Sequence, residues 1–437
     1  MFKVVNKIMN KNTLLALNKS NNFIEQAKYG KISLKNLILF IYFVTIFILL
    51  MDCTDNFPFT ENLREIKYIF IGLLIVDFII NGFKSQYKFR KSSLFILFFF
   101  FLHTILFGLI FVNPTVSELT SVHFREMMIY LLLLAFLVYA VEKYDCRAEF
   151  IKLTALACGI FMLWCGLTHL GDFVNPIYFI YVFSRTERIR AAFGTGNYNY
   201  MGFYTVVSLA FYYATWCIEK RQNNLTTLKK IIILLISFWT LAILFSTSSR
   251  SSILSVLVFV IVWFYQSIVK MTFSRKTAYL IGALFIILLI VAIIVLGEDI
   301  WADANRDENY ETNLPIFEQM GAFWTGMGYI ENAGFLNGAY GYETFPVDVY
   351  YLYIYLSTGV IGSVIIAIPL IYMLIKLIRK KTWFAQIIGL SIYIAMLFDA
   401  FWQVNLFTYR YIPTLFLAVL IITAISKKEE TTFEKTK

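Results

Sequence analysis

Apolar runs of membrane-spanning length alternate with short charged connectors along most of the chain. A bilayer core about 30 Å thick needs about 20 apolar residues to be crossed as a helix. The pattern predicts about twelve transmembrane helices, at residues 36–53, 67–83, 93–112, 127–141, 151–170, 198–218, 231–246, 252–269, 278–297, 349–375, 383–401 and 409–425. An even number of spans places both termini on one side. We therefore expect an all-α polytopic membrane protein.

One long polar segment, residues 298–348, interrupts this pattern. It is rich in Asp, Glu, Gly, Trp and Tyr and contains one basic residue, Arg306. Its aromatic residues suit stacking on sugar rings, although packing at the membrane interface also explains them, and its glycines are typical of a mobile lid. We expect three parts: a basic tail at 1–35, a membrane domain at 36–425 that includes this loop, and a second tail at 426–437.

Composition and charge indicate the solvent and the orientation. Of the 437 residues, 59% are hydrophobic and only 15% are charged, which is typical of a chain embedded in lipid. The positive-inside rule places the basic connectors and both termini in the cytoplasm and segment 298–348 outside. Topology and contact with anionic membrane lipid therefore account for the net charge of +10, and we expect no nucleic-acid partner.

The basic residues that fall on the outer side are the informative ones. Arg64 and Lys67 can be balanced by acids of the same connector. The others are all arginines, although lysine is the commoner basic residue: Arg125, Arg185, Arg188, Arg190, Arg250, Arg306 and Arg410. Arginine presents a planar fork that binds phosphate through two hydrogen bonds, whereas lysine acts as a point charge. This choice favours an anionic ligand on the outer face.

Three of these arginines lie where a predicted helix begins. Arg190 precedes the sixth span, Arg250 precedes the eighth and Arg410 starts the twelfth. Helix N-termini favour phosphate, and residues 246–252 add five serines and a threonine before the eighth span. Converging ends of this kind predict a diphosphate site. The alternative is that the arginines reach lipid headgroups and that the serines only form a tight turn.

Ordered motifs between residues 185 and 370 resemble the O-antigen polymerase and ligase superfamily. Residues 190–199, RAAFGTGNYN, are similar to its Arg, Gly and N-x-N helix entry, and residues 245–250, FSTSSR, to its S-x-S-R signature. Residues 326–329, GMGY, and residues 345–351, FPVDVYY, followed by TGVIG at 358–362, resemble its long-loop elements. The ligase branch carries a histidine in this loop, where this chain has Asp348, so the resemblance is to the Wzy-type polymerase branch.

The resemblance implies an enzyme with a GT-C-like helical bundle in the bacterial cytoplasmic membrane. Such enzymes polymerise O-antigen, capsular or exopolysaccharide by joining oligosaccharide repeat units carried on undecaprenyl diphosphate, without nucleotide sugars. We predict that Arg190 and Arg250 stabilise the departing diphosphate and that Asp348 acts as general base, although Asp348 is equally suited to capping the tenth helix. We assign substrate binding to six further residues: Arg185, Arg188, Asn199, Ser249, Tyr351 and Arg410.

The expected partners are the lipid-linked oligosaccharide, membrane lipid and a chain-length regulator protein. We expect no metal and no cofactor, because the loop contains no D-x-D pair and no histidine. Two alternatives stay open, namely a lipid-linked oligosaccharide flippase and a ligase-like glycan transferase. Of the two acids within spans, Asp399 is expected to pair with Arg250 or Arg410, and Asp77 has no assigned role.

Overall fold

The structure describes most of the chain between residues 34 and 426. The computed structural model covers residues 34–54, 57, 65–82, 90–112, 117–173, 190–269, 274, 276–277, 280–284, 287, 306–328, 347, 349–380, 382–404, 406–409 and 412–426.

Every regular element in these residues is a helix, and none of them forms a strand. The α-helices are α2 (Leu34–Met51), α4 (Ile66–Asp77), α5 (Lys91–Ile105), α6 (Ser117–Lys143), α7 (Arg147–Thr168), α8 (Tyr198–Arg221), α9 (Thr227–Thr247), α10 (Arg250–Phe264), α13 (Arg306–Gln319), α14 (Tyr350–Arg379), α15 (Leu390–Asp399) and α16 (Ile412–Ser426). Single π-helical turns extend α4 to Gly82, α5 to Ile110 and α10 to Val269, and another, Phe384–Gly389, precedes α15.

Eight helices of the described chain are long and apolar enough to cross a membrane. They comprise α2, α5 with its π turn, α6, α7, α8, α9, α10 with its π turn, and α14. Phe384–Asp399 and Ile412–Ser426 are apolar but shorter, and most of the span expected at 278–297 lies outside the described residues. The all-helical class with several candidate membrane spans is therefore confirmed, whereas the count of twelve stays a prediction.

Two local expectations differ from the structure. Helix α6 begins at Ser117 and not at residue 127, so Arg125 lies inside a helix, where it contacts Glu126 at 3.2 Å. Within the polar segment 298–348, residues 306–319 form helix α13. The polar residues in 117–126 and 306–319 lower the hydropathy of these segments, so a search for apolar runs passes over them. Polar residues do not prevent a helix from forming.

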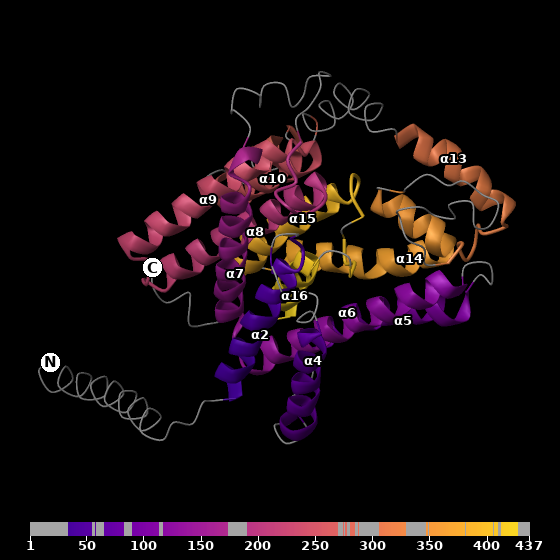
Figure 1. Ribbon diagram of the computed structural model, residues 1–437, viewed down its shortest axis with the longest axis horizontal. Coiled ribbons are helices and arrows are strands. Elements are labelled where there is room, and N and C mark those ends of the chain that lie inside the picture. Colours follow the sequence, from indigo (N-terminus) through magenta and orange to yellow (C-terminus); the bar gives the residue numbers. More distant parts are fainter. Residues whose placement is uncertain are drawn as a thin grey trace, which may run out of the picture.

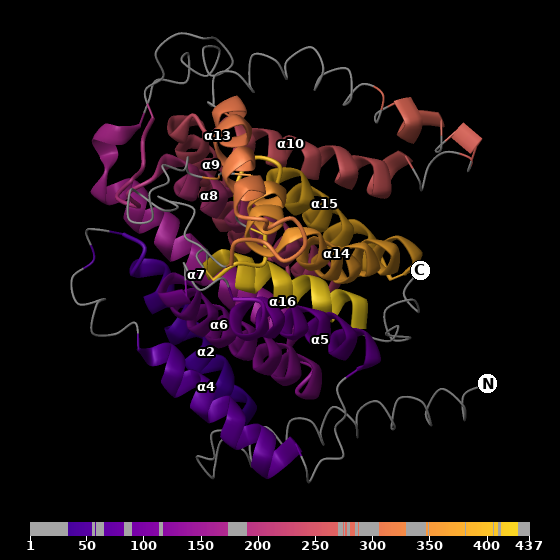
Figure 2. The same ribbon diagram turned by 90° about the vertical axis from the view of Figure 1, so that its right-hand side faces the viewer.

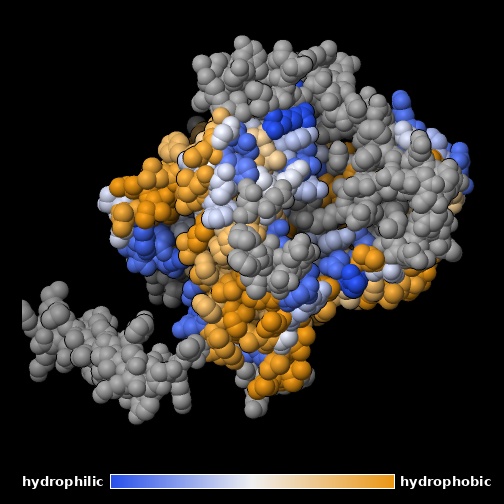
Figure 3. Space-filling view, in the orientation of Figure 1, coloured by the Kyte–Doolittle hydropathy of each residue, from blue (hydrophilic) through white to orange (hydrophobic). Residues whose placement is uncertain are grey.

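Helix α16 forms the centre of the bundle. Its residues from Pro413 to Ser426 are all buried, and it lies between α14 and α15 on one side and α5 and α6 on the other (Figures 1 and 2). Around it, α10 packs against α15 and α8, α7 packs against α2 and α8, and α5 packs against α14. Hydrophobic side chains gather on the outer surface over α2 and α4, as expected of a surface that faces lipid (Figure 3).

Charged side chains pair at the end of the bundle where α8 ends and α9 begins. Lys35 contacts Glu149 at 2.8 Å, and Glu219 binds both Lys152 and Lys229. The alternation of spans had placed all of these residues on one side of the membrane. Their contacts are consistent with that alternation, because each pair joins segments assigned to the same side.

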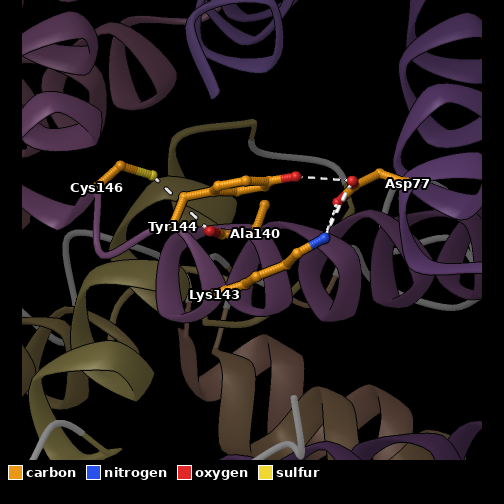
Figure 4. A network of polar contacts seen from close by, with 5 residues as sticks. All are labelled: Asp77, Ala140, Lys143, Tyr144 and Cys146. Carbon is orange, nitrogen blue, oxygen red and sulfur yellow. Dashed lines mark hydrogen bonds and ion pairs between the residues drawn. The ribbon is translucent and has the colours of Figure 1, made fainter. Parts of the chain in front are cut away.

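Asp77, to which the sequence assigned no role, also forms an ion pair with a lysine, Lys143. Its carboxylate accepts hydrogen bonds from the Lys143 ammonium at 3.0 Å and 3.1 Å and from the Tyr144 hydroxyl at 2.7 Å (Figure 4). Burial, followed by the hydrogen bond to Asp77, raises the pKa of Tyr144 to about 12, so the hydroxyl stays a donor at neutral pH. The network fixes the end of α4 to the end of α6.

Candidate polar site at the N-termini of α8 and α10

The site is built where α8 and α10 begin. Asn197 caps α8, since its side chain accepts a hydrogen bond from the Asn199 backbone N–H at 2.7 Å. Helix α10 follows α9 through a turn in which Ser248 adopts a left-handed conformation (φ 52°). The serine-rich stretch is therefore the tight turn that one alternative proposed, and it also brings its hydroxyls to α8.

The two helix ends touch because one residue of α8 has no side chain. A Cβ atom at Gly202 would lie 2.6 Å from Ser252 Oγ and 2.8 Å from Ser249 Cβ. Glycine at this position therefore permits the close approach of the first turns of α8 and α10. A larger residue would push the two N-termini apart.

Ser249 joins the ends through its hydroxyl. It donates to Asn199 Oδ1 at 3.2 Å and contacts the hydroxyls of Ser251 at 3.3 Å and Ser252 at 3.1 Å. It makes no side-chain cap on α10. Ser249 therefore joins α10 to α8 without capping α10, at a helix end of the kind that favours anions.

The segment after α15 completes this polar cluster. Ser255 donates to Asp399 Oδ1 at 2.9 Å, and Gln403 Nε2 donates to Ser251 Oγ at 2.7 Å. Gln403 is buried, and its side-chain oxygen has no hydrogen-bond partner among the described residues. An unused acceptor of this kind is costly unless a ligand or solvent donor satisfies it. Sequence reasoning missed Gln403, although a glutamine between two apolar runs on the outer side was an available signal.

The two arginines at these helix starts differ in burial. Arg250, the first residue of α10, retains 8% of its surface exposed. Arg190 is exposed, donates to the Tyr198 hydroxyl and lies over the ring of Tyr198, 4.5 Å from its centroid. The backbone N–H of the adjacent Ala191 bonds to Ser246 O at 3.2 Å. This bond ties the segment that carries Arg190 to the α9–α10 turn.

The remaining predicted site residues are placed only in part. Arg185, Arg188, Asp348 and Arg410 lie outside the described residues, so their proposed roles stay predictions. Tyr351 belongs to α14 and donates from its hydroxyl to Leu397 O at 2.9 Å. That contact fastens α14 to α15 and occupies the hydroxyl hydrogen that substrate binding would use.

An apolar crevice continues inward from the polar cluster along the same helices. It is lined by Phe203 and Ala210 of α8, Val256 and Phe259 of α10, and Met396 of α15, with Asp399 near its polar end. Its volume of about 30 Å³ is far below the roughly 300–1,000 Å³ of ligand pockets, so this space is a small packing gap beside the polar cluster.

A second feature joins two of the glycine motifs that carried the family resemblance. Helix α14 is broken at Gly359 (φ 64°), and the segment Phe323–Gly328 enters the break. Met327 and Gly328 donate backbone hydrogen bonds to Leu356 O and Ser357 O, each at 2.9 Å. In return, Val360 and Ile361 donate to Phe323 O at 3.0 Å and Trp324 O at 3.1 Å.

The two glycines of this junction are required by its geometry. A Cβ at Gly326 (φ 74°) would lie 2.3 Å from the Ser357 backbone, and one at Gly359 would lie 2.4 Å from the Trp324 backbone. Irregular backbone within a membrane domain is tolerated where protein satisfies it, and often marks a functional region. The sequence showed both motifs but gave no sign that they bind one another.

Histidine 123 forms a further buried polar contact that sequence reasoning did not use. Its Nε2 lies 3.3 Å from the Tyr353 hydroxyl of α14, and its Nδ1 lies 3.1 Å from the Tyr409 hydroxyl. It thereby connects α6, α14 and the segment before α16. No group of three metal-binding side chains gathers anywhere in the described part of the chain.

No family model matches the chain, and no curated protein matches it.

Proposed function

We propose that this chain is a membrane glycosyltransferase that polymerises a surface polysaccharide from oligosaccharides linked to undecaprenyl diphosphate. The observation that carries the proposal is the junction of the N-termini of α8 and α10. Arg250, the first residue of α10, is buried there. Serine, asparagine and glutamine side chains form hydrogen bonds across the same junction. This combination has the chemistry of a diphosphate site. We further propose that the site faces outward from the bacterial cytoplasmic membrane, with both termini in the cytoplasm.

The proposed reaction moves the growing glycan from its lipid carrier to the next repeat unit. The bond between the anomeric carbon and the diphosphate oxygen breaks, and the diphosphate leaves with the electron pair. A hydroxyl oxygen of the acceptor sugar bonds to the anomeric carbon, and its proton passes to a base, the role predicted for Asp348. Arg250, Arg190 and the α10 N-terminus would stabilise the negative charge that develops on the diphosphate.

The test is reconstitution of the purified protein in liposomes. The substrate is the lipid-linked oligosaccharide that accumulates in cells lacking this protein, supplied without nucleotide sugar, and products are separated by gel and mass spectrometry. We expect a ladder of longer glycans together with free undecaprenyl diphosphate, both lost in Arg250→Ala and Arg190→Ala.

Two other results would replace this proposal. Protection of the unchanged substrate from an external glycosidase would indicate a flippase, in which the same arginines dock substrate. Transfer of the glycan to a different acceptor without elongation would indicate a ligase-like transferase. Arg379→Ala, which alters an exposed arginine at the end of α14, is the control and should leave the ladder intact.

A further inference from the structure

A cluster of basic side chains surrounds the last turn of α16, at the end of the bundle opposite the candidate site. Arg90 donates to Ser426 O at 2.7 Å, and Arg147 donates to Thr423 O at 3.4 Å. Lys380 donates to Ile425 O. The three cations come from the residue before α5, the first residue of α7 and the residue after α14, so the fold collects them from distant parts of the chain.

The positive charge of this cluster is larger than the partial negative charge at the C-terminus of α16. A helix C-terminus carries the equivalent of about half a negative charge, against three full positive charges. Within the described chain, no carboxylate lies within ion-pair distance of Arg90 or Arg147, in contrast to Lys35 and Lys152. Arg147 is attracted by the nearby carboxylate of Asp145 and repelled by the guanidinium of Arg90, so the cluster keeps a net positive charge. An anion would relieve this excess charge.

The cluster is not fully enclosed by the fold. Arg90, Arg147 and Lys380 are each only partly buried. Arg147 lies over the Phe384 ring, with its guanidinium carbon 4.2 Å from the ring centroid, which fixes its plane. Arginines held in this way match the geometry of a phosphate better than freely moving lysines do.

Apolar surface continues directly from the cluster along α5 and α14. The rings of Phe95 and Tyr372 lie 4.4 Å apart, which places these stretches of the two helices side by side. On either side of this contact, Leu94 on α5 is 56% exposed and Ile375 on α14 is 40% exposed. Both lie within two turns of the cations Arg90 and Lys380, within the length of an acyl chain.

We propose that Arg90, Arg147 and Lys380 bind the phosphate of an anionic phospholipid whose acyl chains lie along α5 and α14. Basic pockets between membrane helices are known to bind anionic headgroups on the cytoplasmic side. The site is independent of the polymerase proposal, because it lies at the other end of the bundle and uses none of its residues.

The experiment measures lipid binding to the full chain. The wild-type protein is purified in detergent and titrated with phosphatidylglycerol or phosphatidylcholine, with bound lipid counted by native mass spectrometry. We expect phosphatidylglycerol to bind at least about tenfold more tightly, and this preference to be lost in Arg90→Gln/Arg147→Gln, because the variant lacks both guanidinium groups that would pair with the phosphate. The control Lys220→Gln/Lys230→Gln removes the same charge from exposed lysines and should keep the preference.

Three results would overturn the proposal. Equal losses in both double variants would indicate unspecific attraction by the basic surface. Competition by inorganic phosphate at equal concentration would indicate a soluble anion in place of a lipid. A photoreactive acyl chain on phosphatidylglycerol should label residues 91–98 and 371–379 of the wild-type chain. Labelling elsewhere would place the lipid at another site. This test uses no variant, so its result does not depend on how the variants fold.

Discussion

Two polar regions of the bundle use their side chains in different ways. Where α8 passes into α9, carboxylates are paired with cations, as in Glu219 with Lys152 and Lys229. Where α8 and α10 begin, neutral groups contact one another, as in Ser249 with Asn199 and Gln403 with Ser251. Paired charges fix helices but leave little capacity for a ligand. Hydroxyls and amides beside helix N-termini fix helices and still attract an anion.

The largest expected effect lies on the paired side. Asp77→Asn leaves the Lys143 ammonium, whose side chain is 9% exposed, without its countercharge, and should destabilise the protein by about 3–5 kcal/mol. Thermal unfolding in detergent measures this loss. The double variant Asp77→Leu/Lys143→Met should recover most of it, because no buried charge remains. If Asp77→Asn unfolds at the wild-type temperature, the network does not hold α4 to α6.

The next largest effect is on activity and concerns Arg250, at the N-terminus of α10. Arg250→Lys keeps the charge but loses the planar fork, and should reduce polymer formation on the order of 100-fold while the unfolding temperature changes little. The rate of ladder formation in liposomes provides the measurement. Arg379→Lys is the matched control. Similar mild losses in both variants would mean that Arg250 contributes charge alone.

A smaller effect tests the broken helix. Gly359→Ala introduces a Cβ at positive φ and against the Trp324 backbone, which should cost at least about 1–2 kcal/mol and release residues 323–328. Hydrogen exchange of that segment should accelerate. Gly72→Ala, in a helix where no atom lies within 4 Å of the added Cβ, should have no such effect. Unchanged exchange in Gly359→Ala would mean that the junction tolerates rearrangement.

The smallest effect concerns Gln403. Gln403→Met keeps the volume and removes both polar groups, so we expect a loss of about 0.5–1.5 kcal/mol in substrate affinity, seen as a higher KM with little change in kcat. An effect confined to kcat would instead assign Gln403 to positioning of the transition state. Gln386→Met, on the π turn before α15, serves as control.

The sequence predicted those parts of the fold that depend on hydropathy and helix-end chemistry. The all-helical class, several membrane-length helices and the start of α8 after Asn197 follow from local patterns that are visible in one chain. The partnership of Gly326 with Gly359, the pairing of Asp77 with Lys143 and the position of Gln403 depend on tertiary contacts between distant segments. Single-sequence patterns contain no information about such contacts.

The break in α14 has a consequence for motion. In an unbroken helix, Val360 and Ile361 would donate to Leu356 O and Ser357 O, which are the carbonyls that Met327 and Gly328 now bind. The inserted segment thus replaces two possible bonds within the helix by four between segments. Withdrawal of the segment would let the helix close on itself and recover half of them. Straightening of α14 and departure of residues 323–328 are therefore parts of one equilibrium. The two hydrogen bonds gained within α14 would replace two of the four lost between the segments.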